Sequence, residues 1–148
     1  MHNKNWYNFN FVKGPIAPNE LANILSSNSQ LLKVGAYSVF LGQVREDMID
    51  NKTVDAIDYT ANEEMAANIF FEIAATAKPL YNIEYIHILH SLETVKKGEL
   101  CLLVLVSCGH RKESFKAIEY IVERLKKEVP VWGKEILSDK AHSWKVNK

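Results

Sequence analysis

The amino-acid sequence predicts a single α+β domain with a mainly antiparallel or mixed sheet and flanking helices. Apolar segments typical of strands recur along the chain, at residues 7–12, 34–44, 54–59, 83–89 and 100–106. Helical periodicity lies between and after them, at residues 18–25, 60–79 and 111–129. These elements do not follow the regular strand–helix alternation of a doubly wound sheet, and no repeat or interior boundary divides residues 1–148.

The composition supports one folded domain and argues against two broad classes of partner. The 148 residues are 47% hydrophobic and 24% charged, which is enough to bury one core. Eighteen basic residues balance eighteen acidic ones, whereas nucleic-acid and membrane-surface binding usually need a basic excess. We therefore expect neither nucleic acid nor a membrane as partner, and any basic cluster should be local and specific.

Cysteine usage and hydropathy predict a cytoplasmic protein. Cys101 and Cys108 lie in or beside one predicted strand at an odd separation, so they should face opposite sides as reduced thiols, with Cys101 in the core. The first residues lack the apolar core of a signal peptide, and no apolar run is long enough to cross a bilayer. Because no metal-ligand spacing occurs, the sequence predicts no metal and no cofactor.

Two polar segments border the predicted elements. A long apolar strand ends at Arg45, and residues 45–53 are predicted to form a mobile loop at its mouth, where ligands are often bound. A solvated loop charge is an equally simple interpretation of Arg45. Residues 138–148 are polar apart from Trp144, and we expect this tail to order only against a partner.

The helix predicted at residues 111–129 carries a lysine on the border of its apolar face. At about 100° per residue, one stripe holds Phe115, Ile118, Ile121, Val122, Leu125 and Val129. Lys126 falls beside this stripe, where its stem can pack while its ammonium reaches a cleft. A surface lysine is the simpler interpretation of Lys126 alone. The basic residues at the two ends of the helix, His110, Arg111 and Lys134, favour an anion-binding site instead.

The candidate site residues are mostly basic, namely Arg45, His110, Arg111, Lys126 and Lys134. Motifs of phosphate-binding loops, dinucleotide folds and serine hydrolases are missing from the sequence. His87 and His90 are three apart in a predicted strand, so they should face opposite sides and share no metal. Guanidinium and ammonium groups suit a phosphate, while a histidine or a desolvated lysine can move protons. The pattern therefore predicts a phosphorylated substrate.

Several motifs occur together in a fixed order over most of the chain. They are Gly35-Ala36, Phe40-Leu41-Gly42-Gln43-Val44-Arg45, Gly98-Glu99, Ser107-Cys108-Gly109-His110-Arg111, Leu125-Lys126, Val129-Pro130-Val131-Trp132, Lys134-Glu135 and Trp144-Lys145. This combination resembles a known family, the large catalytic subunit of molybdopterin synthase.

The resemblance implies an α/β-hammerhead type fold and a homodimer of large subunits within a heterotetramer. Each large subunit would bind a small ubiquitin-like sulfur-carrier subunit, whose C-terminal Gly-Gly tail ends in a thiocarboxylate. The implied reaction transfers two sulfurs to cyclic pyranopterin monophosphate. The product is the dithiolene of molybdopterin, a step in molybdenum cofactor biosynthesis.

The resemblance also implies a set of substrate-binding residues, which comprises Gln43, Val44, Arg45, His110, Arg111, Lys126, Gly133, Lys134 and Glu135. Within this set Lys126, His110 and Lys134 are the expected catalytic residues. Lys126 would neutralise the thiocarboxylate or form a transient bond with the carrier's terminus. His110 would shuttle protons, while Arg45, Arg111 and Lys134 would hold phosphate and pterin oxygens.

One position departs from the family's pattern, which usually reads Pro-x-Trp-Lys-Lys/Arg-Glu. Gly133 replaces the first lysine of that run, a residue of the catalytic site, and Lys134 matches the second basic residue. In an extended strand a one-residue offset turns the side chain to the other face. Glycine nevertheless permits a local shift that could bring Lys134 round. The sequence thus leaves two interpretations, a weakened enzyme and a repositioned lysine.

Two further functions stay open at this point. The first is a non-catalytic family member that binds the sulfur carrier as a scaffold, and Gly133 is its motivation. The second is a small anion-sensing or RNA-binding module that uses the same basic pocket. The zero net charge and the lack of a basic–aromatic platform disfavour this second function.

Overall fold

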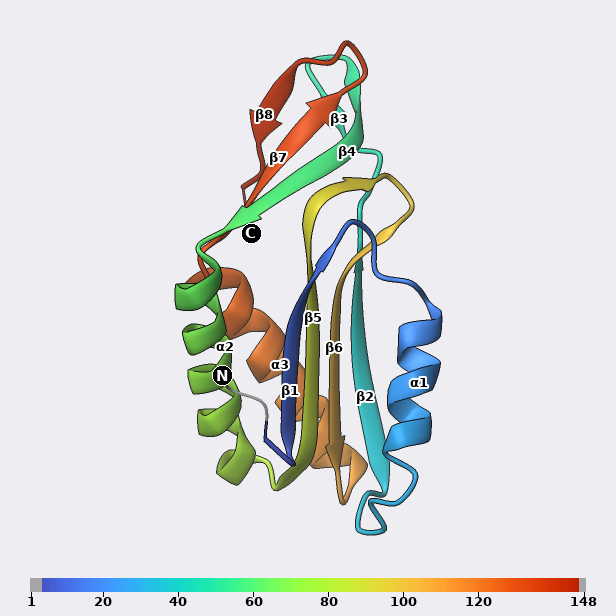
Figure 1. The fold of residues 1–148 in the computed structure, drawn as a ribbon, viewed down its shortest axis with the longest axis vertical. Coiled ribbons are helices and arrows are strands. Elements are labelled where there is room, and N and C mark those ends of the chain that lie inside the picture. Colours follow the sequence, from blue (N-terminus) through green and yellow to red (C-terminus); the bar gives the residue numbers. More distant parts are fainter. Residues whose placement is uncertain (1–3, 147–148) are drawn as a thin grey trace.

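The computed structural model describes residues 4–146. Its strands form one eight-stranded sheet, which three helices accompany (Figure 1). The strands are β1 (Tyr7–Lys13), β2 (Ala36–Gln43), β3 (Met48–Ile49), β4 (Lys52–Ala61), β5 (Ile83–Lys96), β6 (Leu100–Cys108), β7 (Val131–Leu137) and β8 (His142–Trp144). The helices are α1 (Asn19–Ser27), α2 (Glu63–Leu80) and α3 (Arg111–Glu128). The sheet order is β2-β6-β5-β4-β7-β8, with β1 beside β5 and β3 beside β4.

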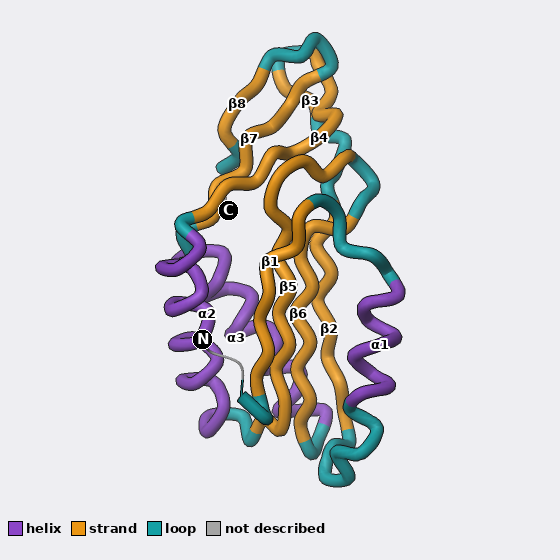
Figure 2. The backbone as a smooth tube through the Cα atoms, in the orientation of Figure 1, coloured by secondary structure: helices purple, strands orange, loops and turns teal. Residues whose placement is uncertain are grey.

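The sheet consists of two parts that β5 joins. Among the described strand pairs only β1 and β5 run parallel, which confirms the expected α+β class. β5 pairs with β1 and β6 first and with β4 only from Glu93 onward, where φ is 66°. Figure 2 shows the long strands β1, β5, β6 and β2 side by side, and a smaller part formed by β3, β4, β7 and β8 at one end.

Helices cover both faces of the longer part of the sheet. Leu103 and Leu105 of β6 pack with Ile24 of α1 on one face. The alternate β6 residues belong to the core shared with α2 and α3; they are Leu102, Val104 and Val106. A strand buried on both faces is expected to be apolar throughout rather than alternating, and the β6 sequence has this character.

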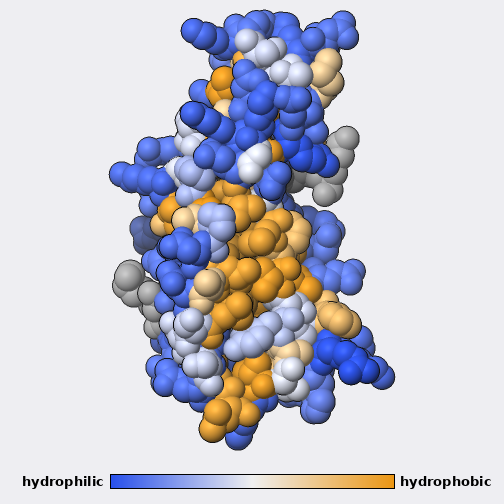
Figure 3. All heavy atoms as spheres, turned by 90° about the vertical axis from the view of Figure 1, so that its right-hand side faces the viewer, coloured by the Kyte–Doolittle hydropathy of each residue, from blue (hydrophilic) through white to orange (hydrophobic). Residues whose placement is uncertain are grey.

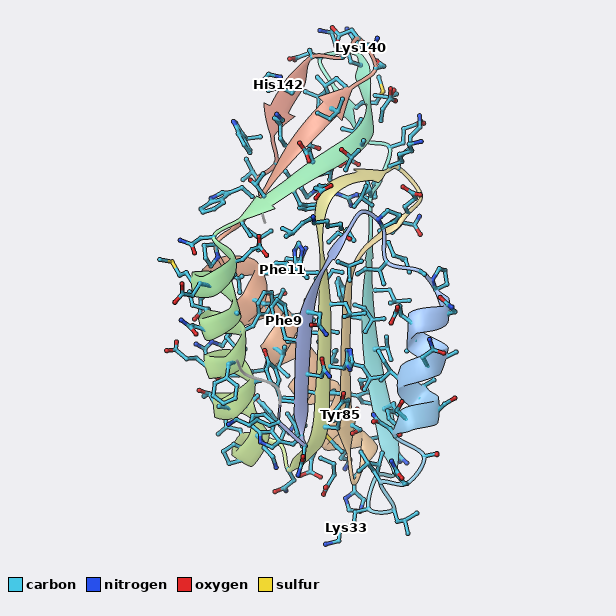
Figure 4. The ribbon with its side chains drawn as sticks, viewed as in Figure 1. Phe9, Phe11, Lys33, Tyr85, Lys140 and His142 are labelled. Atoms are coloured by element: carbon cyan, nitrogen blue, oxygen red, sulfur yellow. The ribbon has the colours of Figure 1, made fainter. Side chains whose placement is uncertain are left out.

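Aromatic packing attaches α2 to β1. The helix begins after Asn62, whose Oδ1 accepts a hydrogen bond of 3.2 Å from the Met65 N–H. On its buried face, the Phe70 ring stacks on Phe9 with 4.3 Å between centroids, and the edge of Phe11 completes the group. Phe9 and Phe11 therefore lie between β1 and α2 (Figure 4).

The helix α3 packs closely against β2 and β6 through small side chains. Its buried residues are Ser114, Ala117, Ile121 and Leu125. Phe115, which we expected on the apolar stripe, is 62% exposed, so that prediction is wrong for the first turns of the helix. The reason is the short distance to the sheet, because Ser114 Oγ lies 2.5 Å from Ser38 Oγ of β2. A phenylalanine ring on that face would hold the helix farther away.

Residues 45–53 form a short hairpin rather than an irregular loop. Met48 and Ile49 of β3 pair with the first residues of β4. The two turn residues, Asp50 and Asn51, have φ of 50° and 63°, which is a backbone region that Asn and Asp tolerate better than most residues.

The expected tail, residues 138–148, is ordered by its own chain as far as the structure describes it. β8 pairs with β7 along Lys134 to Ile136, and Lys52 forms an ion pair of 2.6 Å with Asp139. The expectation that this segment orders only against a partner is therefore wrong for residues 138–146. The last two residues lie outside the described part of the chain.

We expect Phe70→Ala to lower the free energy of unfolding by about 3–5 kcal/mol, because Phe70 is fully buried and a cavity would remain beside Phe9. The matched control is Phe115→Ala, which should cost no more than about 0.5 kcal/mol at its exposed site. Urea denaturation of the two variants measures both values. Equal losses would contradict the described orientation of α2 and α3.

Candidate active site

The end of α3 meets both parts of the sheet at a cleft made of three cavities, of about 80, 970 and 310 Å³. Lys126 and Lys145 line all three, and we call the whole the Lys126 cleft. The smallest cavity is lined by Tyr59, Phe70, His90, Leu125, Lys126, Val129, Val131, Trp132, Gly133 and Lys145. The two larger cavities share Phe40, Arg45, Asp47, Lys126, Glu135 and Lys145.

Lys126 lies in the last turn of α3, next to buried Leu125, on the border that its helical phase predicts. Burial lowers the pKa of Lys126 below its usual value of 10.5. Cys101 partly offsets this effect, and the positive charge of Lys145 lowers the pKa further. A lysine in this environment gives up its proton more readily, so it can act as a cation or, once neutral, as a base or nucleophile.

Arg45 lies at the rim of the cleft, directly after β2. Its Nε and Nη2 each lie 3.3 Å from a carboxylate oxygen of Asp47. The chain is fixed here because the buried Val44 donates its N–H to the Glu99 carbonyl at 3.0 Å. Gln43, Val44 and Arg45 line the same cavity. The structure thus brings these expected site residues together, with a guanidinium that a phosphate can reach.

The strand β7 brings Gly133 and Glu135 to the cleft and turns Lys134 away. Gly133 pairs with Tyr59 of β4, and a Cβ at position 133 would lie 3.2 Å from the Tyr59 ring and 2.9 Å from Ile57 Cγ2. A side chain at position 133 would therefore require Ile57 and the Tyr59 ring to shift. Lys134 lines none of the three cavities, so of the two interpretations left by the sequence the structure does not support the repositioned lysine. Glu135, 7% exposed, lines the two larger ones.

His110 and Arg111 lie far from Lys126 within the chain. They are at the first turn of α3, and fifteen residues of helix place Lys126 roughly 22 Å away along the axis. Gly109, just before them, lies against the backbone of Lys33. Lys33 is at the opposite end of the molecule from Lys140 and His142 of the small part (Figure 4). One chain therefore does not assemble the expected basic set in one pocket.

Sequence patterns did not single out four residues of the cleft, which are Tyr59, His90, Cys101 and Lys145. Tyr59 and Cys101 lie in strands that were predicted, but apolar runs give no sign of which position faces a cavity. For Lys145 a signal was present, because Trp144-Lys145 belongs to the matched motifs.

His90 is held as a neutral imidazole in an aromatic pocket beside Lys126. Its Nδ1 lies 2.8 Å from the Ser91 carbonyl oxygen, so this nitrogen carries the proton and Nε2 is the acceptor. Tyr59 contacts it edge-on at 5.4 Å between centroids. Burial lowers the pKa of His90 to about 4; the Ser91 bond opposes this shift and the Lys126 charge adds to it.

Comparison with known proteins identifies the family. The model of the family described as MoaE protein matches residues 11–128. A Nostoc sp. relative, named molybdopterin synthase catalytic subunit, is 37% identical over 113 residues, which cover 74% of this chain and 67% of the relative. The chain belongs to the MoaE family. The matched regions span only 56% to 75% of the curated relatives' lengths, and some of these relatives are therefore much longer.

Solved structures share the MoaE fold over nearly the whole chain. Molybdopterin synthase from Staphylococcus aureus superposes with a TM-score of 0.81 at 27% identity, covering 98% of this chain and 99% of that one. A complex of subunits 1 and 2 of molybdopterin-converting factor from Helicobacter pylori gives 0.79 at 21% identity, with 95% and 91% covered. The fold that the sequence resemblance implied is confirmed.

In residues 4–146, no group of three His, Cys, Asp or Glu side chains is placed to hold a metal ion. Within the same residues, no helix combines the length and the apolar character that crossing a membrane requires.

We expect the free energy of unfolding to fall as the pH drops from about 6.5 to 4. In this window the unfolded state protonates His90, whereas the folded state, with a pKa of about 4, does not. The slope from His90 is about 1.4 kcal/mol per pH unit. Denaturation at several pH values measures it: His90→Asn should reduce the slope, and His142→Asn, at an exposed site, should keep it. An unchanged slope in His90→Asn would refute the neutral, buried imidazole.

We expect Gly133→Ala to lower the free energy of unfolding by about 1–3 kcal/mol, because the new methyl group would press on Ile57 and Tyr59. In an ordinary strand the same change would be favourable. Chemical denaturation measures the difference, with Lys134→Ala as the neighbouring control. Gly133→Lys carries the same clash. A stability at or above that of the parent would mean that the Tyr59 ring moves aside easily.

Proposed function

We propose that the chain is the catalytic subunit of a molybdopterin synthase, which transfers sulfur from a thiocarboxylated carrier subunit to cyclic pyranopterin monophosphate. Two transfers build the dithiolene of molybdopterin, a step in molybdenum cofactor biosynthesis. The observation that carries the proposal is the half-buried Lys126 with its lowered pKa, at the junction of a narrow and a wide cavity. The relatives' name, molybdopterin synthase catalytic subunit, supplies the reaction.

The two larger cavities suit the pterin phosphate. Their volumes of about 970 and 310 Å³ lie in the range of small-molecule sites. Arg45 can exchange the carboxylate of Asp47 for a phosphate, to which a guanidinium donates parallel hydrogen bonds. Glu135, nearly buried, offers carboxyl oxygens that accept hydrogen bonds, which suits the ring N–H groups of a pterin.

The smallest cavity suits the end of the carrier subunit. A recess of about 80 Å³ is too small for a pterin, and a Gly-Gly tail brings no side chains into it. Lys126, which lines both this recess and the wide cavities, then meets the thiocarboxylate and neutralises its charge. If its neutral amine instead attacks the carbonyl carbon, an amide forms as the sulfur leaves to the substrate, and water then hydrolyses the amide to the carboxylate and frees the lysine. The Helicobacter pylori neighbour, a complex of two subunits of molybdopterin-converting factor, supports such a partner.

A second copy of the chain would complete the site. His110 and Arg111 are too far from Lys126 in one chain, so in the proposed homodimer they act at the partner's cleft. An apolar surface is available for such association, because side chains of β2 and α1 gather on one face (Figure 3). Its exposed members include Leu25, Tyr37, Val39 and Leu41. β2 is also an edge strand, which leaves backbone groups for pairing.

We place the enzyme in the cytoplasm, supported by two buried cysteines that are both free thiols. A scaffold that binds the carrier without turnover is the second candidate, because Gly133 stands where the family has a lysine and a side chain there would press on Ile57 and Tyr59.

We expect Lys126→Ala to lower the single-turnover rate of dithiolene formation by at least about 100-fold, because the cleft loses its central charge. The assay mixes the protein with thiocarboxylated carrier and cyclic pyranopterin monophosphate. Lys127→Ala is the matched control, since Lys127 is exposed and lies 4.0 Å from Glu123 on the outer side of α3. Full activity in Lys126→Ala would refute the assignment, and carrier binding without product in the parent would favour the scaffold.

The same assay tests whether Arg111 of one chain acts at the Lys126 cleft of a second chain. Mixing Lys126→Ala with Arg111→Ala chains should restore roughly a quarter of the parent rate, because half of the dimers then contain one intact site. No recovery after subunit exchange would argue that Arg111 does not serve the partner's cleft.

A further inference from the structure

We propose that Lys145 supplies the second ammonium group of the Lys126 cleft and binds the terminal thiocarboxylate of the carrier subunit together with Lys126. This inference rests on the proposed function, because the carrier is the partner that function requires. In the family, a lysine at position 133 would provide this charge. Here we assign the same charge to Lys145, which directly follows the neighbouring strand β8.

The backbone places Lys145 directly beside Gly133. In the β7–β8 ladder Lys134 is opposite Trp144, and the next pair brings the Lys145 N–H to the Gly133 carbonyl at 2.8 Å. Residues directly opposite each other in an antiparallel pair project to the same face of the sheet. The Lys145 side chain therefore emerges on the side of the sheet to which a side chain at position 133 would point.

The two lysines converge on the same space. Lys145 lines all three cavities with Lys126, and it is half-buried. Its charge reaches Lys126, whose pKa it lowers. Two ammonium groups held together favour an anion between them, since the anion offsets their mutual repulsion and accepts hydrogen bonds from both.

The shape of the recess selects the anion. With about 80 Å³ and walls from Phe70, Leu125 and Val131, it admits a slender chain end and excludes a bulky ring system. Gly133 adds no side chain to that wall, and Tyr59 lines the recess beside it. A carboxyl-terminal glycine that carries a thiocarboxylate, or the carboxylate left after sulfur transfer, fits this description. Arg45, which does not line the recess, remains for the phosphate.

Binding measured without turnover tests the inference separately from the proposed reaction. Titration calorimetry with hydrolysed carrier, which ends in a carboxylate, should show about tenfold weaker binding to Lys145→Met than to the parent, and Lys145→Arg should recover most of it. Lys134→Met is the matched control in the same hairpin and should leave the affinity unchanged. A carrier that lacks its terminal Gly-Gly should bind the parent and Lys145→Met equally.

A second readout follows the local charge. NMR titration should show a higher pKa for Lys126 in Lys145→Met and no change in Lys134→Met. Unchanged carrier affinity in Lys145→Met, or a loss that Lys134→Met matches, would overturn the inference. So would a weaker affinity for cyclic pyranopterin monophosphate alone, because Lys145 would then bind the phosphate. If the parent binds carrier through Lys145 yet forms no product, the inference stands and the proposed enzyme activity fails.

Discussion

The close packing of α3 on the sheet decides where the charged groups of this protein can lie. Ile121 and Leu125 are buried, so the helix cannot turn about its axis without exposing apolar surface at a cost of about 25 cal/mol per Å². This orientation directs Lys126 into the cleft and leaves Lys127 in solvent one residue later. Because α3 is straight and long, it also separates Arg111 from Lys126. The arrangement of charges follows from a hydrophobic contact.

A second constraint is the register of the small part of the sheet. Tyr59, Gly133 and Lys145 lie side by side on β4, β7 and just beyond β8. Because Gly133 has no side chain, the Tyr59 ring can come within 3.2 Å of the place where a Cβ would lie. The same row keeps Lys145 at the edge of the recess. Backbone pairing depends little on side-chain identity. It thus places Lys145 beside Gly133, a position that has no side chain of its own.

The sequence predicted those features that depend on apolar periodicity. The α+β class, the existence of a strand at residues 100–106 and the border position of Lys126 follow from which residues must leave water. Helical phase could not show how closely α3 approaches β2, and for this reason Phe115 was misplaced. β8 was missed because a strand of only three residues, His-Ser-Trp, has no pattern of its own and is ordered by β7. The separation of His110 and Arg111 from the cleft depends on tertiary geometry, which motif order does not contain.

The contact between the Tyr59 ring and Gly133 also bears on how such sequences diverge. A Cβ at position 133 would lie 2.9 Å from Ile57 Cγ2 and 3.2 Å from the Tyr59 ring, so a side chain there requires both neighbours to shift. A substitution at position 133 is therefore coupled to the side chains at positions 57 and 59. A chimera that takes only one of these three positions from a lysine-bearing relative should be a poorer protein than either parent.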